Sequence, residues 1–375
     1  MGQTYGIDER YSRVVVHFLK VVNETTGGYR EFAVWRTRHM EHEKNIVFIC
    51  GTREKCGKKT FPEAEVVWGN NDIGRIRQII EEICAICRKK GIPLVFHIQQ
   101  HGVIMNLIKA CAGLNIRKHM LYTMQSTFSG YTSRKLKCNC TLTALYARHL
   151  TFLSYASYED YPKIIKLLKH GNISVIEHGA YQDEIIRINW TERKNIKKPV
   201  LELVYTARLV PVKNHMFLLD IIEALENVHI TFIGGGEQQS VIQKEIERRH
   251  LEDKVTITGL VRREEVYKIL GQGDIYMSSS KVEGLPVSVL EAMHTGLPIL
   301  LSDIGPHIEL AQKTDSIMTL PLEKQLWIDK LNELKQLKTE ELAKLGEKNA
   351  RVANRYFTLD RMHRRYSRLY SSLEL

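Results

Sequence analysis

A short stretch in the second half of the chain combines a helix N-terminus with acidic side chains. An apolar run at residues 274–277 predicts a buried strand, and residues 287–295 are compatible with a helix. Pro286 suits the first helical position, and Gly296 suits the position just past the helix end. Gly284 and Leu285 should then present free backbone N–H groups, which form a site for an anion.

Two glutamates, eight residues apart, flank this predicted anion site. Glu283 lies on the loop before the helix, and Glu291 lies roughly two turns into it, near the same side. A carboxylate beside an anion site is best explained by neutral hydroxyl partners, whose hydrogen bonds it accepts strongly. A nucleotide-sugar carries both a diphosphate and sugar hydroxyls. The alternative is two surface glutamates on an ordinary strand–helix connection.

Arg208 and Lys213 supply candidate cations for such a diphosphate. They follow a predicted strand at residues 201–205 and are five residues apart, so they can converge on one phosphate. The sequence has no Asp-x-Asp pair that would clamp a metal diphosphate. Together with the helix N-terminus, the two cations would replace a metal electrostatically. Surface charges at a strand end are the alternative, and we expect no metal site.

Several motifs in this half resemble the family-four retaining glycosyltransferases, whose donor signature is Glu-x7-Glu. The similarity runs from about residue 203 to Glu309 and comprises residues 206–215, 232–236, 255–259, 283–298 and 302–305. The resemblance implies a metal-independent, retaining hexosyltransferase that uses a nucleotide-sugar, with a UDP-sugar expected, and no cofactor. It also implies a role in bacterial cell-surface polysaccharide or glycolipid synthesis.

The resemblance also assigns roles to residues. Arg208, Lys213 and Glu283 are the expected catalytic residues, with Glu283 on the donor-sugar hydroxyls and Glu291 on the ribose hydroxyls. The other expected donor-binding residues are Gly27, Gly28, Gln125, Gly235, Gly236, Gly259, Leu260, Gly284, Leu285 and Pro286.

Position 125 departs from the family pattern. Relatives often carry a histidine there that reaches the donor sugar, whereas Gln125 can donate a hydrogen bond but cannot carry charge. His101 is a candidate for part of that role, and His178 is a second histidine expected near the cleft. A loop histidine without a ligand is the alternative for His101.

The elements that position these residues alternate between strand and helix in both halves of the chain. Such alternation predicts parallel sheets with helices on both faces. The expected fold is therefore α/β, with two facing Rossmann-like domains and ligands in a cleft at the carboxyl ends of the strands. This is the glycosyltransferase-B (GT-B) fold of the resembled family. We expect an acceptor-side domain at 1–190, a donor domain at 196–357, and a helix at 358–375 that packs back on the first domain.

Composition sets the broad class of the protein. The chain has 375 residues, 43% of them hydrophobic and 26% charged, as in soluble globular proteins. No apolar run approaches the roughly 18 residues needed to span a bilayer. The N-terminal residues lack the basic and apolar regions of a signal peptide. A cytoplasmic location is expected, at the inner face of the membrane if the acceptor is lipid-linked.

The positive charge is concentrated in the first half. Residues 1–190 contain 27 Lys and Arg against 17 Asp and Glu, and residues 83–158 contain ten bases and no acid. This asymmetry favours an acidic partner, namely an anionic membrane surface or a phosphorylated or lipid-linked glycan acceptor. No nucleic-acid partner is expected because no binding motif is present. A solvated basic face is the alternative.

The seven cysteines all lie in the first half, and Cys84-x-x-Cys87 invites a metal or redox interpretation. Their spacing relative to Ile76, Ile80 and Ile83 instead places both thiols on the apolar face of a helix. We therefore expect reduced, buried thiols.

Two other functions share the predicted fold. A nucleotide-sugar 2-epimerase would need histidines and carboxylates for proton transfer, which cannot be matched in the sequence. A catalytically silent nucleotide-sugar-binding protein is favoured by Gln125 but not by the intact set of Arg208, Lys213, Glu283 and Glu291.

Overall fold

The computed structural model describes residues 5–20, 42–50, 57–60, 64–69, 71–180, 184–193 and 200–374. The chain divides into two compact units. Unit 1 comprises Met1–Glu177 and Met362–Leu375, and unit 2 comprises His178–Arg361. The glycines predicted to contact the donor at positions 27 and 28 lie outside the described residues.

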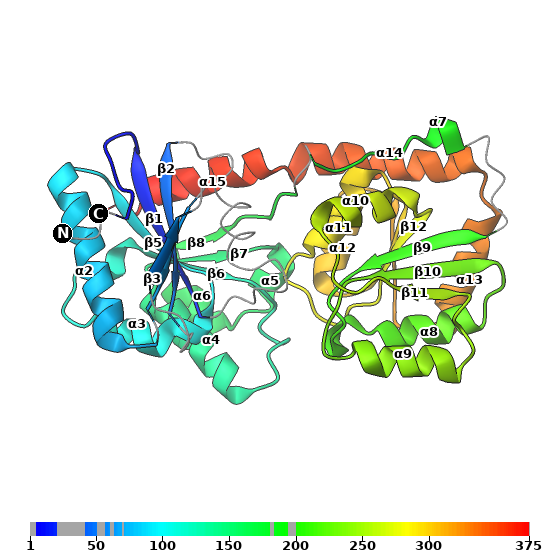
Figure 1. Cartoon of the computed structure of the whole chain (residues 1–375), viewed down its shortest axis with the longest axis horizontal. Coiled ribbons are helices and arrows are strands. Elements are labelled where there is room, and N and C mark those ends of the chain that lie inside the picture. Colours follow the sequence, from blue (N-terminus) through cyan, green and yellow to red (C-terminus); the bar gives the residue numbers. More distant parts are fainter. Residues whose placement is uncertain are drawn as a thin grey trace. The chain divides into compact units, whose positions relative to one another are not determined.

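Unit 1 is built on an eight-stranded sheet with the order β3-β4-β2-β1-β5-β6-β7-β8 (Figure 1). All neighbouring strands pair in parallel except β3 and β4. Every residue of the central strands β1, β2 and β5 is buried, as expected for a parallel sheet that is covered on both faces. The strands are β1 (Arg13–Leu19), β2 (Glu43–Ile49), β3 (Gly57–Thr60), β4 (Glu65–Trp68), β5 (Leu94–Ile98), β6 (Met120–Met124), β7 (His149–Phe152) and β8 (Ile173–Val175).

The helices of unit 1 connect these strands. The longest helix among the described residues of unit 1 is α2; its N-cap is Asp72, whose carboxylate accepts from Arg75 N at 3.0 Å. Its apolar face carries Cys84 and Cys87 into the core, and burial raises the pKa of these thiols to about 11 and about 12. The helices are α2 (Ile73–Lys90), η1 (His101–Val103), α3 (Ile104–Ala110), η2 (Arg117–His119), α4 (Arg134–Tyr146), α5 (Tyr155–Glu159) and α6 (Lys163–Leu168).

Unit 2 contains a six-stranded, fully parallel sheet with the order β11-β10-β9-β12-β13-β14. Helices α8 and α9 lie on one face of this sheet and α10 and α11 on the other (Figure 1). The strands are β9 (Leu201–Thr206), β10 (Val228–Ile233), β11 (Val255–Ile257), β12 (Ile275–Ser278), β13 (Ile299–Ser302) and β14 (Ile317–Leu320). The helices are α7 (Trp190–Arg193), η3 (Pro211–Lys213), α8 (His215–Glu223), α9 (Gln239–Arg248), α10 (Arg263–Gln272), α11 (Val287–Thr295), α12 (Gly305–Ala311), α13 (Lys324–Gln336) and α14 (Thr339–Tyr356).

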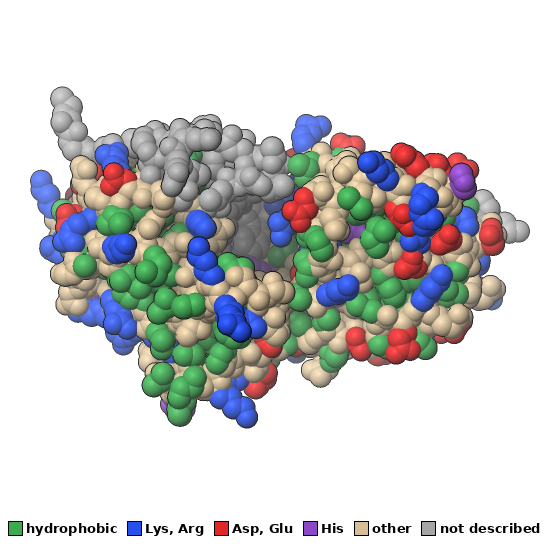
Figure 2. All heavy atoms as spheres, turned by 90° about the horizontal axis from the view of Figure 1, so that it is seen from below, with side chains coloured by type: hydrophobic (Ala, Val, Ile, Leu, Met, Phe, Trp, Pro, Cys, Tyr) green, Lys and Arg blue, Asp and Glu red, His purple; other side chains and the backbone are tan. Residues whose placement is uncertain are grey.

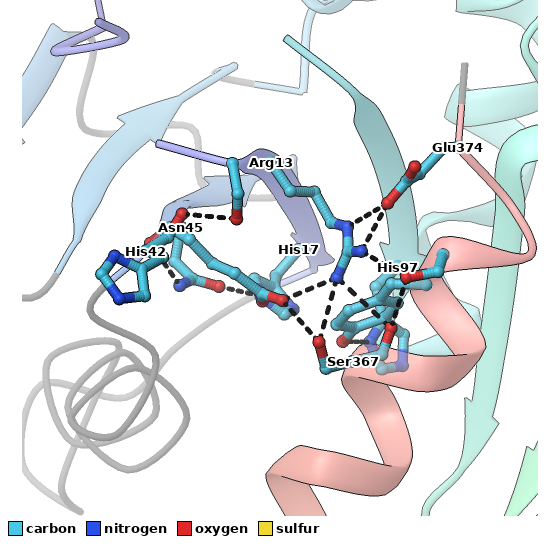
Figure 3. Close-up of polar contacts among 11 residues, drawn as sticks. Arg13, His17, His42, Asn45, His97, Ser367 and Glu374 are labelled. Carbon is cyan, nitrogen blue, oxygen red and sulfur yellow. Dashed lines mark hydrogen bonds and ion pairs between the residues drawn. The ribbon is translucent and has the colours of Figure 1, made fainter. Parts of the chain in front are cut away.

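The last helix, α15 (Leu359–Ser371), begins in unit 2 and continues into unit 1. Arg13 on β1 binds Glu43 on β2 at 2.7 Å, and it also contacts Ser367 and Glu374 of the C-terminal segment (Figure 3). Tyr370 bonds His97 on β5 at 2.8 Å. One face of the unit 1 sheet is therefore completed by the last residues of the chain.

The fold agrees with the predicted pair of Rossmann-like domains, but the domain boundary differs. The sequence analysis assigned residues up to 190 to the first domain, whereas residues from 178 belong to unit 2. The reason is local packing, because Trp190 lies against Leu342 and Ala343 and donates to Gly296 O at 3.1 Å. None of the helices within the described residues is long and apolar enough to cross a membrane.

Each sheet has one point at which the strand order reverses. In unit 2 the order runs outward from β9 in one direction and from β12 in the other, so the switch lies between these two strands. In unit 1 it lies between β1 and β5. Ligands of open parallel sheets bind outside the carboxyl ends of the strands at such points.

Candidate functional site

The residues that were predicted to carry catalysis lie at the switch point of unit 2. Arg208 and Lys213 follow β9, and Glu283 follows β12, the neighbouring strand across the switch. Lys213 is the last residue of η3, and Asn214 after it takes a left-handed conformation with φ 58°, which asparagine tolerates better than most residues. This turn directs the chain into α8.

Lys213 and Glu283 form an ion pair with each other. Their side chains are only 18% and 11% exposed, so each charge needs a partner. Sequence reasoning placed Lys213 on a phosphate and Glu283 on sugar hydroxyls, and it did not anticipate this pairing. Arg208 differs: it is exposed, and its guanidinium makes no hydrogen bond or ion pair with any other described residue.

Hydrogen bonds fix the two loops that carry this ion pair. Buried Tyr205 donates to Lys213 O at 3.0 Å, and its hydroxyl also bonds Ser280 Oγ at 2.9 Å. Ser279 Oγ donates to Asn214 O at 3.0 Å, and Lys281 N donates to a backbone oxygen of η3 at 2.9 Å. The loop after β9 is thus tied to the loop after β12 independently of the ion pair.

The glycine-rich loop after β10 lies directly against the segment that carries Arg208. A Cβ at Gly234 would stand 2.3 Å from Ala207 O, and one at Gly236 would stand 2.4 Å from Leu209 O. Leu209 N donates to Gly235 O at 3.0 Å, so this close approach is hydrogen-bonded. The close approach of the two backbones requires glycine at positions 234 and 236. The sequence analysis had proposed a donor contact for Gly235 and Gly236.

The loop after β11 completes this edge of the sheet. Gly259, with φ 67°, bridges to Gly234, and Leu260 beside it is 54% exposed. The Leu260 side chain would lie 3.0 Å from a Cβ at Gly235. An exposed leucine next to two glycines offers an apolar surface at the same edge as Arg208.

Helix α11 spans residues 287–295, as predicted, and Pro286, which was expected at the first helical position, is its N-cap. Gly296 is the C-cap with φ 85°, as predicted. Gly284 and Leu285 are buried beneath this helix start.

Glu291 lies in the second turn of α11 and accepts from buried Tyr267 at 3.0 Å. Both glutamates interact electrostatically with buried Tyr276. Burial raises the pKa of Tyr276 well above its ordinary value, and the charges of Glu283 and Glu291 contribute to the same shift.

The remaining predicted residues belong to other parts of the fold. Gln125 directly follows β6 and His101 begins η1, both in unit 1, so neither shares a unit with Lys213 and Glu283. His101 packs edge-on against Tyr131, and burial, together with Lys20, lowers its pKa. His178 is a buried residue at the start of unit 2.

Sequence reasoning missed the hydroxyl groups that support the site. Tyr205 and Tyr267 are buried tyrosines whose hydroxyls contact Lys213 O and Glu291, respectively. The run Ser278–Ser280 was a usable signal, because three small hydroxyl residues at a strand end can bond a neighbouring loop. Nothing in the sequence pairs Tyr267 with Glu291.

The described residues contain no group of three or more His, Cys, Asp or Glu side chains that could hold a metal. Arg208 and Lys213 contribute positive charge at the edge, and Lys281 lies on the loop after β12. Together, the site offers two cations, a carboxylate paired with one of them, and an apolar side chain, a set suited to a ligand with anionic, hydroxyl and apolar parts.

Part of the chain is similar in sequence to known proteins. Residues 186–352, less than half of the chain, match the family described as glycosyl transferases group 1. CapH of Staphylococcus aureus, a capsular polysaccharide biosynthesis glycosyltransferase, is 27% identical over 270 residues, which cover 66% of this chain and 70% of CapH.

Solved structures resemble the whole chain in fold. Sucrose-phosphate synthase from Thermosynechococcus elongatus has a TM-score of 0.77 at 14% identity and covers 96% of this chain and 99% of its own. HepE from Anabaena in complex with UDP-glucose has a TM-score of 0.73 at 14% identity, with the same coverage of both chains. At such identities the likeness shows the fold alone.

Proposed function

We propose that the chain, whose residues 186–352 match glycosyl transferases group 1 and which has the GT-B fold, transfers a hexose from a nucleotide-sugar to a glycan acceptor. The reaction is retaining and needs no metal. The product belongs to cell-surface polysaccharide or glycolipid synthesis, as the name of CapH suggests.

The Lys213–Glu283 ion pair is the observation that carries this proposal. It lies at the switch point of unit 2, and exposed Arg208 follows the same strand. When a nucleotide-sugar binds, Lys213 turns to the diphosphate and Glu283 accepts hydrogen bonds from sugar hydroxyls. Both charges keep a partner during this exchange, so neither is left desolvated and unpaired.

The cations stabilise the departing diphosphate. Negative charge develops on the leaving oxygen as the glycosidic bond breaks, and preorganised positive groups lower the energy of that state. In the retaining reaction the leaving oxygen accepts the proton of the acceptor hydroxyl on the same face of an oxocarbenium-like sugar. Glu291 holds the ribose hydroxyls, and Tyr267 orients its carboxylate.

A donor screen by thermal unfolding tests the proposal. UDP-, GDP- and ADP-sugars are added separately, and a UDP-sugar is expected to raise the unfolding midpoint. Saturation at about 100 times the dissociation constant should add roughly 2.7 kcal/mol of stability. NMR of the released sugar then reports retention, and activity should persist in EDTA. Binding without release would favour a silent binding protein, and a changed configuration at C2 would favour an epimerase.

The acceptor side of the proposal concerns unit 1, whose surface suits an anionic membrane carrying a lipid-linked acceptor. Helix α6 exposes Ile164, Leu167 and Leu168 at 60%, 70% and 64%. Their spacing places them on one outward face, while Ile165 faces the core. Three adjacent apolar side chains that are exposed to water indicate a surface that contacts another molecule or a membrane.

The bases of residues 83–158 have different local roles. Arg88, Lys89 and Lys90 occupy the last turn of α2, where the helix dipole favours them. Arg134, Lys135 and Lys137 occupy the first turn of α4, where the dipole opposes them. Basic residues at a helix N-terminus lower the stability of the helix, and binding to an anionic partner offsets this cost. Figure 2 shows that Lys and Arg far outnumber Asp and Glu on the visible face of unit 1.

Co-sedimentation with liposomes tests the membrane contact. The protein should bind vesicles that contain anionic lipid at low salt, and high salt should release it because screening weakens the attraction. Leu167→Ser should weaken binding, whereas Val241→Ser, at another exposed apolar position in unit 2, should not. Equal binding to neutral vesicles, or no binding at low salt, would indicate a soluble acceptor.

A further inference from the structure

A buried histidine lies at the same edge of the unit 2 sheet as the Lys213–Glu283 ion pair. His307 is in the first turn of α12, which follows β13, and its side chain is fully buried. The chemistry proposed for Lys213, Glu283 and Glu291 does not involve this imidazole. A buried titratable ring beside charged groups at the carboxyl edge is a candidate for a further role in the reaction.

Two hydrogen bonds fix the tautomer of His307. Its Nδ1 lies 2.9 Å from Ser302 O and 3.1 Å from Ser302 Oγ. The carbonyl oxygen can only accept, and Ser302 Oγ gives its own hydrogen to Ser280 O at 2.6 Å. Nδ1 therefore carries the proton of the neutral ring, and Nε2 is left with a lone pair.

The Nε2 atom of His307 is buried and has no hydrogen-bond partner among the described residues. A buried acceptor without a partner destabilises a fold, so native structures contain few of them and each calls for an explanation. Packing does not provide one, because an apolar side chain could fill the same space without this cost. The lone pair of an imidazole is, however, a place where a proton can bind.

His307 is coupled to the ion pair at the site. Ser302, to which its ring is bonded, donates to Ser280 in the loop that leads to Glu283. Burial lowers the pKa of His307 to about 4, while Glu283 of that loop favours the charged imidazole and Lys213 of η3 opposes it. The ring is therefore neutral as long as the two charges are paired with each other.

Donor binding changes this balance. In the proposed reaction Lys213 turns to the diphosphate, and Glu283, whose side chain is only 11% exposed, loses its cation. Sugar hydroxyls then give the carboxylate hydrogen bonds but no positive charge. A desolvated carboxylate without a cation is strongly disfavoured. The imidazole can supply the missing charge if Nε2 binds a proton, because Nδ1–H stays on Ser302 in both states.

We propose that His307 takes up one proton from solvent when a nucleotide-sugar draws Lys213 away from Glu283, and that the imidazolium then replaces Lys213 as the counter-charge of this glutamate. The donor step of this inference rests on the proposed function. His307 is a positioning residue, because it acts on the substrate only through Glu283. Donor binding is therefore coupled to the uptake of a proton.

The first test needs no donor. Nuclear magnetic resonance of histidine labelled at ring carbon Cε1 reports the protonation of each imidazole, and the signal missing from His307→Asn identifies His307. In the unmodified chain the ring should be neutral above a pKa of about 4. Lys213→Met leaves Glu283 unpaired and should raise this pKa by about 1–3 units, the usual effect of one close charge. Adding Glu283→Gln to Lys213→Met should return it to the original value.

The second test follows the proton during donor binding. The full chain is titrated calorimetrically with UDP-glucose, or with the nucleotide-sugar that the screen identifies, in buffers of equal pH and different ionisation enthalpy. A nucleotide-sugar has no terminal phosphate whose own titration would contribute. We expect uptake of up to about one proton per bound donor, and none in His307→Asn. Because the complex holds the proton more tightly than the free enzyme, affinity should fall by up to about 10-fold per pH unit as pH rises toward the pKa of the complex.

Matched variants separate this coupling from a general change of charge. Asp303→Asn and Glu309→Gln remove the two carboxylates that are nearest to His307 in the sequence. Neither should change the titration of His307 or the proton uptake. If His307→Asn does not fold, Glu283→Gln replaces it in the calorimetry, and the donor at saturation should then bind without proton uptake.

Each result decides the inference. A His307 that stays neutral in Lys213→Met would overturn it, because Glu283 would then take the proton itself. Donor binding without proton uptake, or with equal uptake in His307→Asn, would overturn it while leaving the proposed function intact. If no nucleotide-sugar binds, the proposed function and the donor step fail together, and the donor-free titration still decides whether the charge of His307 depends on the ion pair.

Discussion

The buried ion pair between Lys213 and Glu283 is the residue-scale feature with the clearest chemical consequence. A buried pair is weak evidence for stability, because desolvation offsets much of its attraction. At a carboxyl edge beside Arg208, it is better understood as two ligand-binding groups that neutralise each other until a ligand separates them.

Removing the cations should therefore reduce turnover. We expect Arg208→Ala and Lys213→Ala each to lower kcat by about 100- to 1000-fold, the usual effect of losing a preorganised stabiliser of developing charge. Lys281→Ala is the matched control, because Lys281 is an exposed lysine on the loop after β12. Near-normal turnover in both site variants would rule out their catalytic role.

The two glutamates should respond differently to the same substitution. Glu291→Gln keeps an acceptor for Tyr267 and should mainly raise KM, since the ribose lies away from the bond that breaks. Glu283→Gln should lower kcat as well, because its sugar partner moves toward the transition state. Steady-state kinetics with the donor identified by the screen would decide, and identical kinetic patterns would refute the division of roles.

The buried imidazole of His215 makes the stability of the protein depend on pH. It is buried against Tyr205 and Phe232, and neither ring nitrogen has a hydrogen-bond partner among the described residues. Burial lowers its pKa to about 4, below the value near 6.5 of the unfolded chain. The unfolded state thus binds the proton first, so stability falls as pH drops from about 6.5 to about 4, by up to about 1.4 kcal/mol per pH unit.

Urea unfolding over this pH range checks the assignment. His215→Phe should unfold near the same urea concentration as the unmodified chain at pH 7.5 and should lose less stability on acidification. His170→Gln, a change at an exposed histidine, should leave the pH dependence unaltered. A steeper acid loss in His215→Phe would contradict a neutral, buried His215.

At the scale of elements, the site depends on the bonds that join the loops after β9 and β12. Tyr205→Phe removes the hydroxyl that bonds Lys213 O and Ser280 Oγ. We expect a loss of about 1–3 kcal/mol in unfolding free energy, because buried partners are left unsatisfied, together with a several-fold drop in kcat/KM. Tyr122→Phe, at a buried tyrosine whose hydroxyl contacts sulfur atoms, should leave kcat/KM unchanged. A Tyr205→Phe enzyme with unaltered kinetics would show that the loops hold without it.

The sequence was most informative about the secondary-structure elements and the fold, and less so about contacts between individual side chains. Apolar runs and glycine positions predicted the strands, the C-cap at Gly296 and the two Rossmann-like domains, because these follow from local periodicity and backbone conformation. The Lys213–Glu283 pair and the Tyr267–Glu291 bond could not be predicted, since they join residues 70 and 24 positions apart. The same limit applies to Trp190, whose packing on Leu342 moved the domain boundary.

At the scale of the whole molecule, the C-terminal segment is a structural part of unit 1. Arg13 is buried and binds Glu43, Ser371 and Glu374. Arg13→Ala leaves Glu43, whose pKa burial already raises, without its buried cation and should cost about 3–5 kcal/mol of stability. Arg10→Ala, at an exposed pair with Asp8, should leave the unfolding midpoint unchanged. Thermal unfolding followed by circular dichroism would compare them, and equal midpoints would refute the role of Arg13.

The dependence of β1 and β5 on Ser367, Tyr370 and Glu374 has a consequence for biosynthesis. Residue 177 leaves the ribosome almost two hundred residues before the C-terminal segment that completes its unit. At about 5–20 residues per second, the nascent N-terminal sheet waits on the order of 10–40 s with its polar face uncovered, whereas unit 2 can fold during that interval. Unit 1 therefore completes its fold after unit 2, although most of unit 1 is translated first. While it waits, its incomplete sheet is a natural client for a ribosome-associated chaperone.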